Sequence, residues 1–393
     1  MPNCSICDSP SSRVLSMGMQ PLANKYPSCT DDFEHEVVRE MEVFFCDQCN
    51  YANIPCDIDR STFFEDYYYL SSVNKELVAH FEEVAMLIEK HNPKLTIDIG
   101  SNDGILLKPL KEKGLRAIGV DPSENVSAIA NAAGLETLVG FYDLAMVERI
   151  LKDYGQPDFL CASSVFTHFE RPRDFFEVSA QLLSEDGLIL VEVEYLRQII
   201  DTLGFERLYF DRPHYYSIKS LKTIAERSGF SLIDVVNVDA HGGSIRATFC
   251  RKGSKKASPS VERKISEEST YLNRSTILEK FELFKSACEE LAQKIDQFNA
   301  NGIKLAAYGC PARFSTITNV ASIGPNRIPF VIDDSPLKQG RFSPKMHIPI
   351  VSSDSIGHID LFIVFAYEYI NSIKSKLDLN QAEFYKPIPF SKI

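Results

Sequence analysis

Apolar residues follow a helical spacing in some parts of the chain and form short continuous runs in others. The first sustained helical pattern begins at Val73 and stops before Pro93, which predicts an amphipathic helix. The apolar run at 95–100 then predicts a buried strand, and 105–114 the helix after it. Further strands are predicted at 116–121, 158–163, 187–195 and 230–239, and another helix at 124–134. Strands that alternate with helices favour an α/β fold with a doubly wound, mainly parallel sheet.

A second alternation of strands and helices follows residue 250. Residues 251–260 are basic and rich in Gly, Ser and Pro, which is typical of a linker. A long polar helix is predicted next, over about 261–299. Strands are then predicted at 304–309, 328–334 and 361–369, with helices at 314–324 and 371–377. The chain is therefore expected to contain a second, smaller α/β domain.

The composition narrows the classes of function. Asp and Glu outnumber Lys and Arg by 54 to 42, so the formal net charge is −12. An acidic chain without a long basic block is a poor binder of nucleic acid and of anionic membranes. Its apolar runs are shorter than the roughly 18 residues of a membrane span, and residues 1–12 lack the apolar stretch of a signal peptide. We therefore expect a cytoplasmic protein with a small-molecule substrate and favour a monomer.

The cysteines cluster near the start of the chain. Cys4 and Cys7 form one C-x-x-C pair, and Cys46 and Cys49 form another. Four thiolates from two such turns can close the tetrahedral coordination sphere of a zinc ion, and neither pair lies beside a strand–helix unit, as redox dithiols do. We therefore expect a structural zinc ion. The spare ligand candidates are Cys29 and Cys56.

A loop with two glycines follows the first predicted strand of the central domain. Gly100 allows a tight turn, and Gly104 removes a side chain where a ligand would approach. The dinucleotide fingerprint G-x-G-x-x-G is not met, because Asn102 and Asp103 interrupt it. The pattern D-x-G-x-x-x-G, which starts at Asp98, is instead the one that S-adenosylmethionine sites use, and it makes Asn102 and Asp103 further candidates for cofactor binding.

Residues at the ends of the next predicted strands extend this cofactor site. Asp121 ends the second strand and is placed to accept hydrogen bonds from both hydroxyls of a ribose. Asp143 is placed to reach an adenine amino group. The same predicted edge also carries Pro122, Ser163 and Ser164. The glycine loop, the acid and the topology together predict binding of S-adenosylmethionine.

Several short segments, taken in their order along the chain, resemble the sugar C-methyltransferases of deoxysugar biosynthesis. The segments are CSIC, CDQC, YYYLSS, DIGSNDGILL, GVDPSENV, SSVFTHF, EVEYL, residues 205–217, HGGSIR, YGCPAR and IDDSPLKQGRF. The resemblance covers nearly the whole chain. It implies a nucleotide-linked 6-deoxysugar as substrate, methylated on the carbon next to a 4-keto group.

The same resemblance implies the organisation of the chain. A small zinc-binding N-terminal module would occupy residues 1–70. A central class I S-adenosylmethionine methyltransferase domain with a Rossmann-like fold would follow at 71–250. A linker at 251–265 would lead to a smaller Rossmann-like α/β domain at 266–393, which would bind the nucleotide of the substrate.

The resemblance also suggests which residues carry the chemistry. A base must remove the proton next to the ketone, while a hydrogen-bond donor stabilises the enolate oxygen. The family's Tyr-His-Glu-His run reads Tyr209-Phe210-Asp211-Arg212 here, so an arginine stands where the base is expected. Arginine stays protonated and cannot take the proton. The catalytic candidates are His168, which is the better candidate for the base, His214, Tyr209, Asp211 and Arg212, and an early tyrosine that matches Tyr67 or Tyr69.

The segment 308–313, YGCPAR, follows the first predicted strand of the C-terminal domain and precedes a helix. A glycine and a helix N-terminus suit an anion, and Arg313 adds a positive charge. In the family this region faces the nucleotide diphosphate of the substrate. The resemblance therefore implies substrate contacts for Tyr308, Gly309, Arg313 and Asp333, and His241 in HGGSIR is a further candidate.

Two alternatives remain open at this point. Arg212 raises the possibility of an oxygen methyltransferase, or of a different phosphorylated or carboxylated substrate, because a hydroxyl is a stronger acid than a carbon next to a ketone. A zinc-containing binding or regulatory protein without turnover is the second alternative. The sequence leaves open the sugar, the methylated position and atom, the nucleobase and the oligomeric state.

Overall fold

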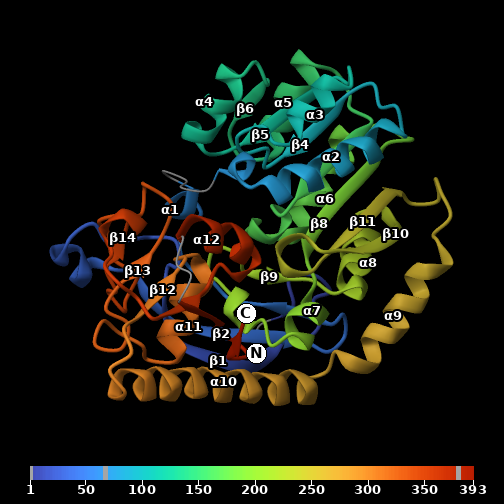
Figure 1. The fold of residues 1–393 in the computed structure, drawn as a ribbon. Coiled ribbons are helices and arrows are strands. Elements are labelled where there is room, and N and C mark those ends of the chain that lie inside the picture. The colour runs from blue at the N-terminus through green and yellow to red at the C-terminus, as the bar shows by residue number, and fades with distance from the viewer. Residues whose placement is uncertain (1–2, 65–69, 378–381) are drawn as a thin grey trace. The chain divides into compact units, whose positions relative to one another are not determined.

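The structure, a computed structural model, describes residues 3–64, 70–377 and 382–393, and only the backbone of His241. Its residues divide into two units (Figure 1). The first unit comprises residues 1–12, 44–198 and 211–274, and the second comprises 13–43, 199–210 and 275–393. The first 70 residues are therefore shared between the two units.

Seven strands form one sheet in the described part of the first unit, in the order β10-β11-β8-β7-β4-β5-β6. The five strands from β8 to β6 are parallel, and β11 runs antiparallel to both of its neighbours. This sheet confirms the expected mainly parallel α/β architecture. The strands are β4 (Thr96–Ile99), β5 (Ala117–Asp121), β6 (Thr137–Val139), β7 (Phe159–Ser163), β8 (Leu188–Glu194), β10 (Phe230–Val238) and β11 (Ser244–Arg251).

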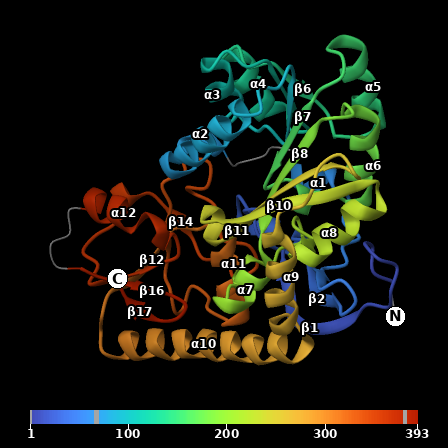
Figure 2. The same ribbon diagram turned by 90° about the vertical axis from the view of Figure 1, so that its right-hand side faces the viewer.

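Helices cover both faces of this sheet, as Figure 2 shows with the sheet seen nearly edge-on. Strand β8 illustrates why, because all its residues are buried and successive side chains point to opposite faces. Leu188 and Leu190 pack with α2 and α3, whereas Ile189 and Val191 pack with α5, α6 and α8. The helices are α2 (Lys75–Glu89), α3 (Leu107–Glu112), α4 (Glu124–Ala132), α5 (Leu144–Asp153), α6 (Pro172–Leu182) and α8 (Ile218–Arg227).

The cysteine pairs share the hydrophobic core of the first unit. Strand β3 (Tyr51–Asn53) pairs with the end of β2 (Val38–Cys46) on one side and with β9 (His214–Tyr215) on the other. Cys4, Cys49 and Tyr51 belong to the same buried cluster as residues of β8, α6 and α8. The cysteine turns are therefore packed onto the helices that cover one face of the sheet.

The described part of the second unit contains a six-stranded sheet in the order β14-β13-β12-β15-β16-β17. Its first five strands are parallel and β17 is antiparallel. The strands are β12 (Leu305–Tyr308), β13 (Val331–Ile332), β14 (Ile350–Val351), β15 (Leu361–Val364), β16 (Glu383–Lys386) and β17 (Ser391–Lys392). Strand for strand, this order repeats β6-β5-β4-β7-β8-β11 of the first sheet. The two units therefore share one topology, which the sequence alone does not reveal.

Other elements complete the two units. The neighbouring strands β1 (Ser12–Pro21) and β2 lie largely in the second unit, together with α10 (Arg274–Ala300), α11 (Ala312–Val320) and α12 (Ile370–Leu377). Two short helices are α1 (Ser61–Phe64) and α7 (Leu196–Asp201). Short 3₁₀-helices lie at Thr30–His35, Ser71–Val73, Phe166–His168, Phe205–Arg207, Ala240–Gly242, Ser353–Ser355 and Tyr367–Tyr369.

The prediction of one long helix over 261–299 is wrong, because the chain forms two separate helices there. Helix α9 (Pro259–Tyr271) ends where Leu272 adopts an extended backbone and buries its side chain, and α10 begins at Arg274. The carbonyl of Leu272 accepts a hydrogen bond from the Asn50 side chain at 3.3 Å, which satisfies one carbonyl left open by the break. Helix α9 also takes up residues 259–265 of the segment expected as a linker.

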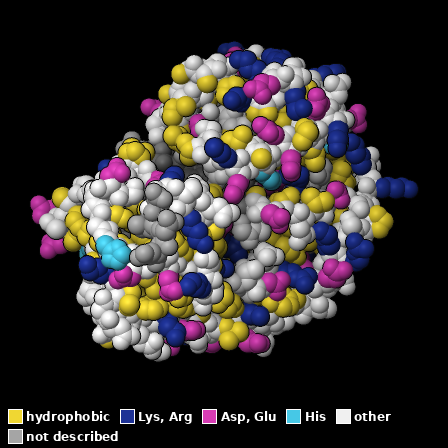
Figure 3. Space-filling view, in the orientation of Figure 1, with side chains coloured by type: hydrophobic (Ala, Val, Ile, Leu, Met, Phe, Trp, Pro, Cys, Tyr) yellow, Lys and Arg dark blue, Asp and Glu magenta, His cyan; other side chains and the backbone are white. Residues whose placement is uncertain are grey.

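The described helices include none that combines the length and the apolar character required to cross a membrane. On the face shown in Figure 3, Lys and Arg side chains are interspersed with Asp and Glu side chains.

Candidate active site

The glycine loop lies where the strand order of the first sheet reverses, between β4 and β7. Gly100 has a φ of +74°, and a Cβ added to it would lie 2.7 Å from the side chain of Val165, which follows β7. The Gly100 N–H donates to the carbonyl of Val120 on β5 at 2.7 Å. Only a glycine fits this position, because the backbone is left-handed and the loop after β7 lies against it. Open parallel sheets bind ligands at this kind of reversal.

Asp121 fastens this loop to the end of β5. Its Oδ2 accepts the backbone N–H of Asn102 and its Oδ1 accepts that of Ser123, both at 2.9 Å. A carboxylate has about four lone pairs, so both oxygens can accept one more hydrogen bond each. The carboxylate is thereby fixed in one orientation and can still take the two hydroxyls of a ribose.

Asp98 is the second acid of the predicted cofactor site. Its side chain is buried at the end of β4, and burial together with the negative charge of Asp121 raises the pKa of Asp98 well above its usual range. Such a carboxyl favours a ligand that brings its own positive charge, because a cation would restore the ionised form. The ammonium group of S-adenosylmethionine supplies such a charge.

The remaining predicted cofactor residues have structural partners in the same unit. The Asn102 side chain accepts the N–H of Ser71 at 3.0 Å, and Asp103 accepts both the N–H and the hydroxyl of Ser72. Together they hold residues 71–72 over the loop. A Cβ on Gly104 would meet Leu135, so this glycine is needed for helix packing.

The predicted residues further along the sheet edge differ in what they contact. Asp143 is exposed and caps α5 by accepting the N–H of Met146 at 2.9 Å. Ser163 donates its hydroxyl to Glu192 at 2.8 Å, and Ser164 has a φ of 60° in the turn after β7. Pro122 directly follows Asp121 at the end of β5.

His168 lies at the end of the turn that follows β7, at the same edge of the sheet. Its Nδ1 contacts the backbone carbonyl of Asp211, and since a carbonyl can only accept, Nδ1 carries the proton. Burial, with the positive charges of Arg212 and Arg60 nearby, lowers the pKa of His168 to about 3. The imidazole is therefore neutral at ordinary pH and keeps its lone pair on Nε2.

Arg212 forms an ion pair that the sequence does not suggest. Its Nη1 lies 2.5 Å from Oε1 of Glu194, the last residue of β8. The other oxygen of Glu194, Oε2, is buried and has no hydrogen-bond partner among the described residues. Asp211, Arg212, Glu194 and His168 are close enough to influence one another electrostatically. Three predicted catalytic residues and one unpredicted carboxylate thus come together in the first unit.

A second carboxylate on β8 organises a neighbouring cluster. Glu192 contacts Arg246 through Oε1, while its Oε2 accepts from Ser163 at 2.8 Å and lies 2.7 Å from His80 Nε2. Arg246 belongs to the HGGSIR segment and is nearly buried. All the acceptor oxygens of Glu192 are therefore engaged, unlike those of Glu194.

The other catalytic candidates are placed differently. His214 has both ring nitrogens engaged, because Nε2 donates to the carbonyl of Phe169 at 2.6 Å and Nδ1 accepts the hydroxyl of Tyr51, which favours a structural role. Tyr209 belongs to the second unit. Tyr67 and Tyr69 lie outside the described residues, as does the side chain of His241.

The four cysteines of the two C-x-x-C pairs converge. The sulfur atoms of Cys4 and Cys49 are 3.7 Å apart and those of Cys7 and Cys46 are 3.4 Å apart, and all four lie within 4.8 Å of one another. Zinc–sulfur bonds of about 2.3 Å place the sulfurs of a tetrahedral site about 3.8 Å apart. The cluster therefore has the donors and the spacing to hold a metal ion. Cys29 and Cys56 are not part of it.

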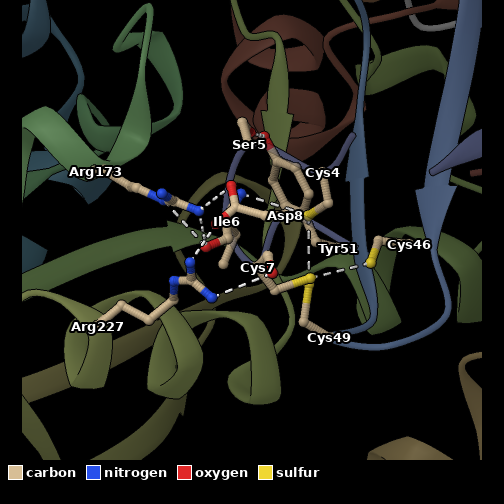
Figure 4. A network of polar contacts seen from close by, with 10 residues as sticks. All are labelled: Cys4, Ser5, Ile6, Cys7, Asp8, Cys46, Cys49, Tyr51, Arg173 and Arg227. Atoms are coloured by element: carbon tan, nitrogen blue, oxygen red, sulfur yellow. Dashed lines mark hydrogen bonds and ion pairs between the residues drawn. The ribbon is translucent and has the colours of Figure 1, made fainter. Parts of the chain in front are cut away.

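The turns that present these cysteines are built alike and are tied down (Figure 4). The residue after each C-x-x-C, Asp8 in one case and Asn50 in the other, has a positive φ. Arg173 of α6 donates to the carbonyl of Ile6 at 2.8 Å and to Asp8 at 2.6 Å, and Arg227 of α8 also contacts Asp8. Two helices that cover one face of the seven-stranded sheet thus hold the first cysteine turn.

The loops of the second sheet repeat the loop geometry of the first. Gly309 follows β12 with a φ of +83°, and an added Cβ would lie 2.6 Å from Ala366, which follows β15. Asp333, after β13, accepts the N–H of Cys310 at 2.8 Å and that of Ser335 at 2.9 Å. Asp333 thus has the same contacts in the second unit that Asp121 has in the first.

Charged side chains surround this second loop. Arg313 of α11 lies 2.6 Å from Glu368 and over the ring of Tyr367 at 4.9 Å, and Lys386 lies 4.5 Å from the same ring. Lys338 lies 3.3 Å from Asp333. Tyr308 donates its hydroxyl to Asp334 at 2.8 Å. Of these cations, the sequence indicated only Arg313.

Comparisons with known proteins identify the chemistry. A profile described as a methyltransferase domain matches residues 71–235, and one described as a C-methyltransferase C-terminal domain matches residues 239–389. The C-methyltransferase NovU of Streptomyces niveus is 28% identical over 397 aligned residues, which cover 97% of this chain and 93% of NovU. The protein is an S-adenosylmethionine-dependent methyltransferase. It resembles the C-methyltransferases over almost its whole length.

Other relatives match a smaller share of the chain. The mitochondrial ubiquinone biosynthesis O-methyltransferase of Bos taurus is 26% identical over 157 residues, covering 36% of this chain and 42% of that protein. The magnesium protoporphyrin IX methyltransferase of Synechocystis, solved with bound S-adenosylmethionine, covers 50% of this chain and all of its own, with 16% identity and a TM-score of 0.37.

A first prediction concerns the methyl donor. Replacing Asp121 by Ala removes a fixed acceptor pair, a loss of about 2–3 kcal/mol, and calorimetry should show S-adenosylhomocysteine binding weakened about 30- to 150-fold. The exposed Asp153 on α5 provides a control, since Asp153→Ala should bind normally. Normal affinity in a folded Asp121→Ala variant would exclude Asp121 from the donor site.

Proposed function

We propose that the protein methylates a carbon next to a keto group on a nucleotide-linked deoxysugar. The observation that carries this proposal is the repetition of the donor-site geometry in the second unit. Asp333 accepts two backbone N–H groups from its own turn and from the loop after β12, as Asp121 does for the loop after β4. A carboxylate so fixed suits a second nucleoside, with its ribose hydroxyls as donors.

Basic side chains of the second unit support a diphosphate beside that nucleoside. Arg313 lies at the start of α11, where the helix N-terminus also favours an anion. Lys386 and Arg207 lie near Tyr367, as Arg313 does, and Lys338 lies at Asp333. The similarity to a C-methyltransferase over 97% of the chain agrees with a methyl acceptor of this kind.

The reaction needs a proton acceptor and a partner for the enolate oxygen. When bound, S-adenosylmethionine supplies a methyl group on a positively charged sulfur. The enolate carbon forms the new carbon–carbon bond, and the electron pair of the broken sulfur–carbon bond stays on sulfur. Arg212 is the cation placed to neutralise the enolate, and Gly100 and Asp121 orient the donor.

Oxygen methylation is the second candidate, because Arg212 occupies the position where the resemblance expects an imidazole base. Product analysis decides between the two. The protein should transfer a labelled methyl group to a nucleoside-diphosphate-linked 4-keto-6-deoxyhexose, tested as a panel of nucleobases in heavy water. We expect a new carbon–carbon bond in the product, and deuterium at the carbon next to the ketone in the recovered, unmethylated substrate. A methyl ether without exchange would support the oxygen methyltransferase, and no transfer across the panel would contradict the proposed substrate class.

The nucleotide site of the second unit can be tested without turnover. Asp333→Ala should weaken the binding of the matching nucleoside diphosphate at least tenfold in calorimetry, because the loop after β12 loses its anchor and the ribose its acceptor. Binding of S-adenosylhomocysteine should stay unchanged. Asp354→Ala, at an exposed position of the same unit, serves as the control. Equal nucleotide affinity in wild type and Asp333→Ala would place the nucleotide elsewhere.

The cysteine cluster is proposed to hold a structural zinc ion. Four thiolates leave no open coordination position, so the ion would stabilise the fold and take no part in the chemistry. Metal analysis of the purified protein should give about one zinc per chain, and Cys46→Ser should lower both the zinc content and the melting temperature. The exposed Cys29 is the matched control, because Cys29→Ser should keep its zinc. Zinc-free protein with full thermal stability would refute the assignment.

A further inference from the structure

The ion pair of Glu194 and Arg212 leaves one carboxylate oxygen unused in the middle of the candidate site. Oε1 of Glu194 is held by Arg212 at 2.5 Å, whereas Oε2 is buried and has no hydrogen-bond partner among the described residues. The Glu194 side chain is 7% exposed. Leaving a buried charged oxygen unpaired is unfavourable, and each such group calls for an explanation.

The position of Glu194 in the fold points to the same site. Glu194 is the last residue of β8, which lies next to β7 and has the same direction. Its carboxylate is therefore at the edge of the sheet that carries the glycine loop, Asp121 and His168. Arg212, whose side chain is 22% exposed, lies on the side of the pair that is open to solvent or ligand.

We propose that Glu194 is the proton acceptor of the methyl transfer, with Arg212 as its ion-pair partner, which then pairs with the enolate. This inference rests on the proposed carbon methylation. The role of the base is thereby assigned to a residue outside the run Tyr209–Arg212. Arg212 cannot itself take a proton, but as the ion-pair partner of Glu194 it has a function at the position where the base was expected.

The charges of the step balance. The C–H bond next to the ketone breaks, its electron pair moves into the enolate, and the proton forms an O–H bond at Oε2 of Glu194. The negative charge thus passes from the carboxylate to the enolate oxygen, and Arg212 turns from one to the other. Arg212 therefore has one negative partner before the step and one after it, so the step leaves neither charge of the pair unpaired in a buried place.

The neighbouring candidates are less suited to accept the proton. Protonation of His168 would add a third cation beside Arg212 and Arg60, which is unfavourable at short range, and burial together with these two charges lowers the pKa of His168. Burial raises the pKa of Asp211, which favours its protonated form. Glu192 has both oxygens engaged by Arg246, His80 and Ser163. A glutamate base for a proton next to a carbonyl has ample precedent.

The test separates proton removal from methyl transfer. The full-length protein is incubated in heavy water with S-adenosylhomocysteine and the nucleotide-linked keto sugar that the wild type methylates. Deuterium uptake at the carbon next to the ketone is followed by NMR and compared with an enzyme-free sample. Glu194→Gln keeps the volume and the contact of Oε1 with Arg212 but cannot take a proton.

We expect Glu194→Gln to exchange about two to four orders of magnitude more slowly than wild type, with unchanged affinity for S-adenosylhomocysteine. Glu194→Asp should exchange faster than Glu194→Gln, because it restores a carboxylate that is one methylene shorter. Glu185→Gln, an exposed glutamate in the turn before β8, should exchange at the wild-type rate.

The outcomes distinguish this inference from the function on which it rests. If wild type carries out no exchange and forms no carbon–carbon bond with any keto sugar of the panel, carbon methylation itself fails. If wild type exchanges and Glu194→Gln does so equally fast, only the role of Glu194 fails. Loss of exchange in His168→Ala or Asp211→Asn, with exchange kept in Glu194→Gln, would overturn the proposal and assign the proton to that residue.

Discussion

A carboxylate that receives two backbone N–H groups fixes the ligand loop in each sheet. Asp121 joins the loop after β4 to the turn after β5, and Asp333 does the same for β12 and β13. Without these bonds, a loop with a left-handed glycine would have several conformations available, and ordering them costs about 1–2 kcal/mol per residue. Because the loop is already ordered, a nucleoside can bind without that cost.

The ligands proposed for the two loops differ because the residues around each loop differ. In the first unit, the edge of the sheet carries buried acids, among them Asp98, and these suit a donor with ammonium and sulfonium charges. In the second unit, Arg313, Lys338 and Lys386 lie around the corresponding loop and suit phosphate. In this proposal the side chains around each loop, more than the shared backbone geometry, determine which ligand binds there.

Periodicity and local spacing were enough to predict β4, β5, β7, β8 and β10 of the first sheet, β12, β13 and β15 of the second, the glycine loop and the pairing of the cysteine turns, but not β6, β11, β14, β16 or β17. Each of the predicted features depends on residues close together in the sequence. The ion pair of Glu194 with Arg212 and the contacts of Glu192 with His80 and Arg246 depend on tertiary packing, and no local pattern reveals them. The helix break at Leu272 was not predicted from the sequence for the same reason, because it is accompanied by a contact with Asn50, which is distant in the sequence.

The division of the chain has a practical consequence for handling this protein. The backbone passes from one unit to the other after residues 12, 43, 198, 210 and 274. A single proteolytic cut therefore cannot release either unit as one intact piece, and a fragment that ends near residue 250 would retain β1 and residues 199–210 without the sheet of their own unit. Expression of the donor-binding half alone would need those segments removed or re-designed, and a dissection of this enzyme into separate domains must join pieces that are distant in the sequence.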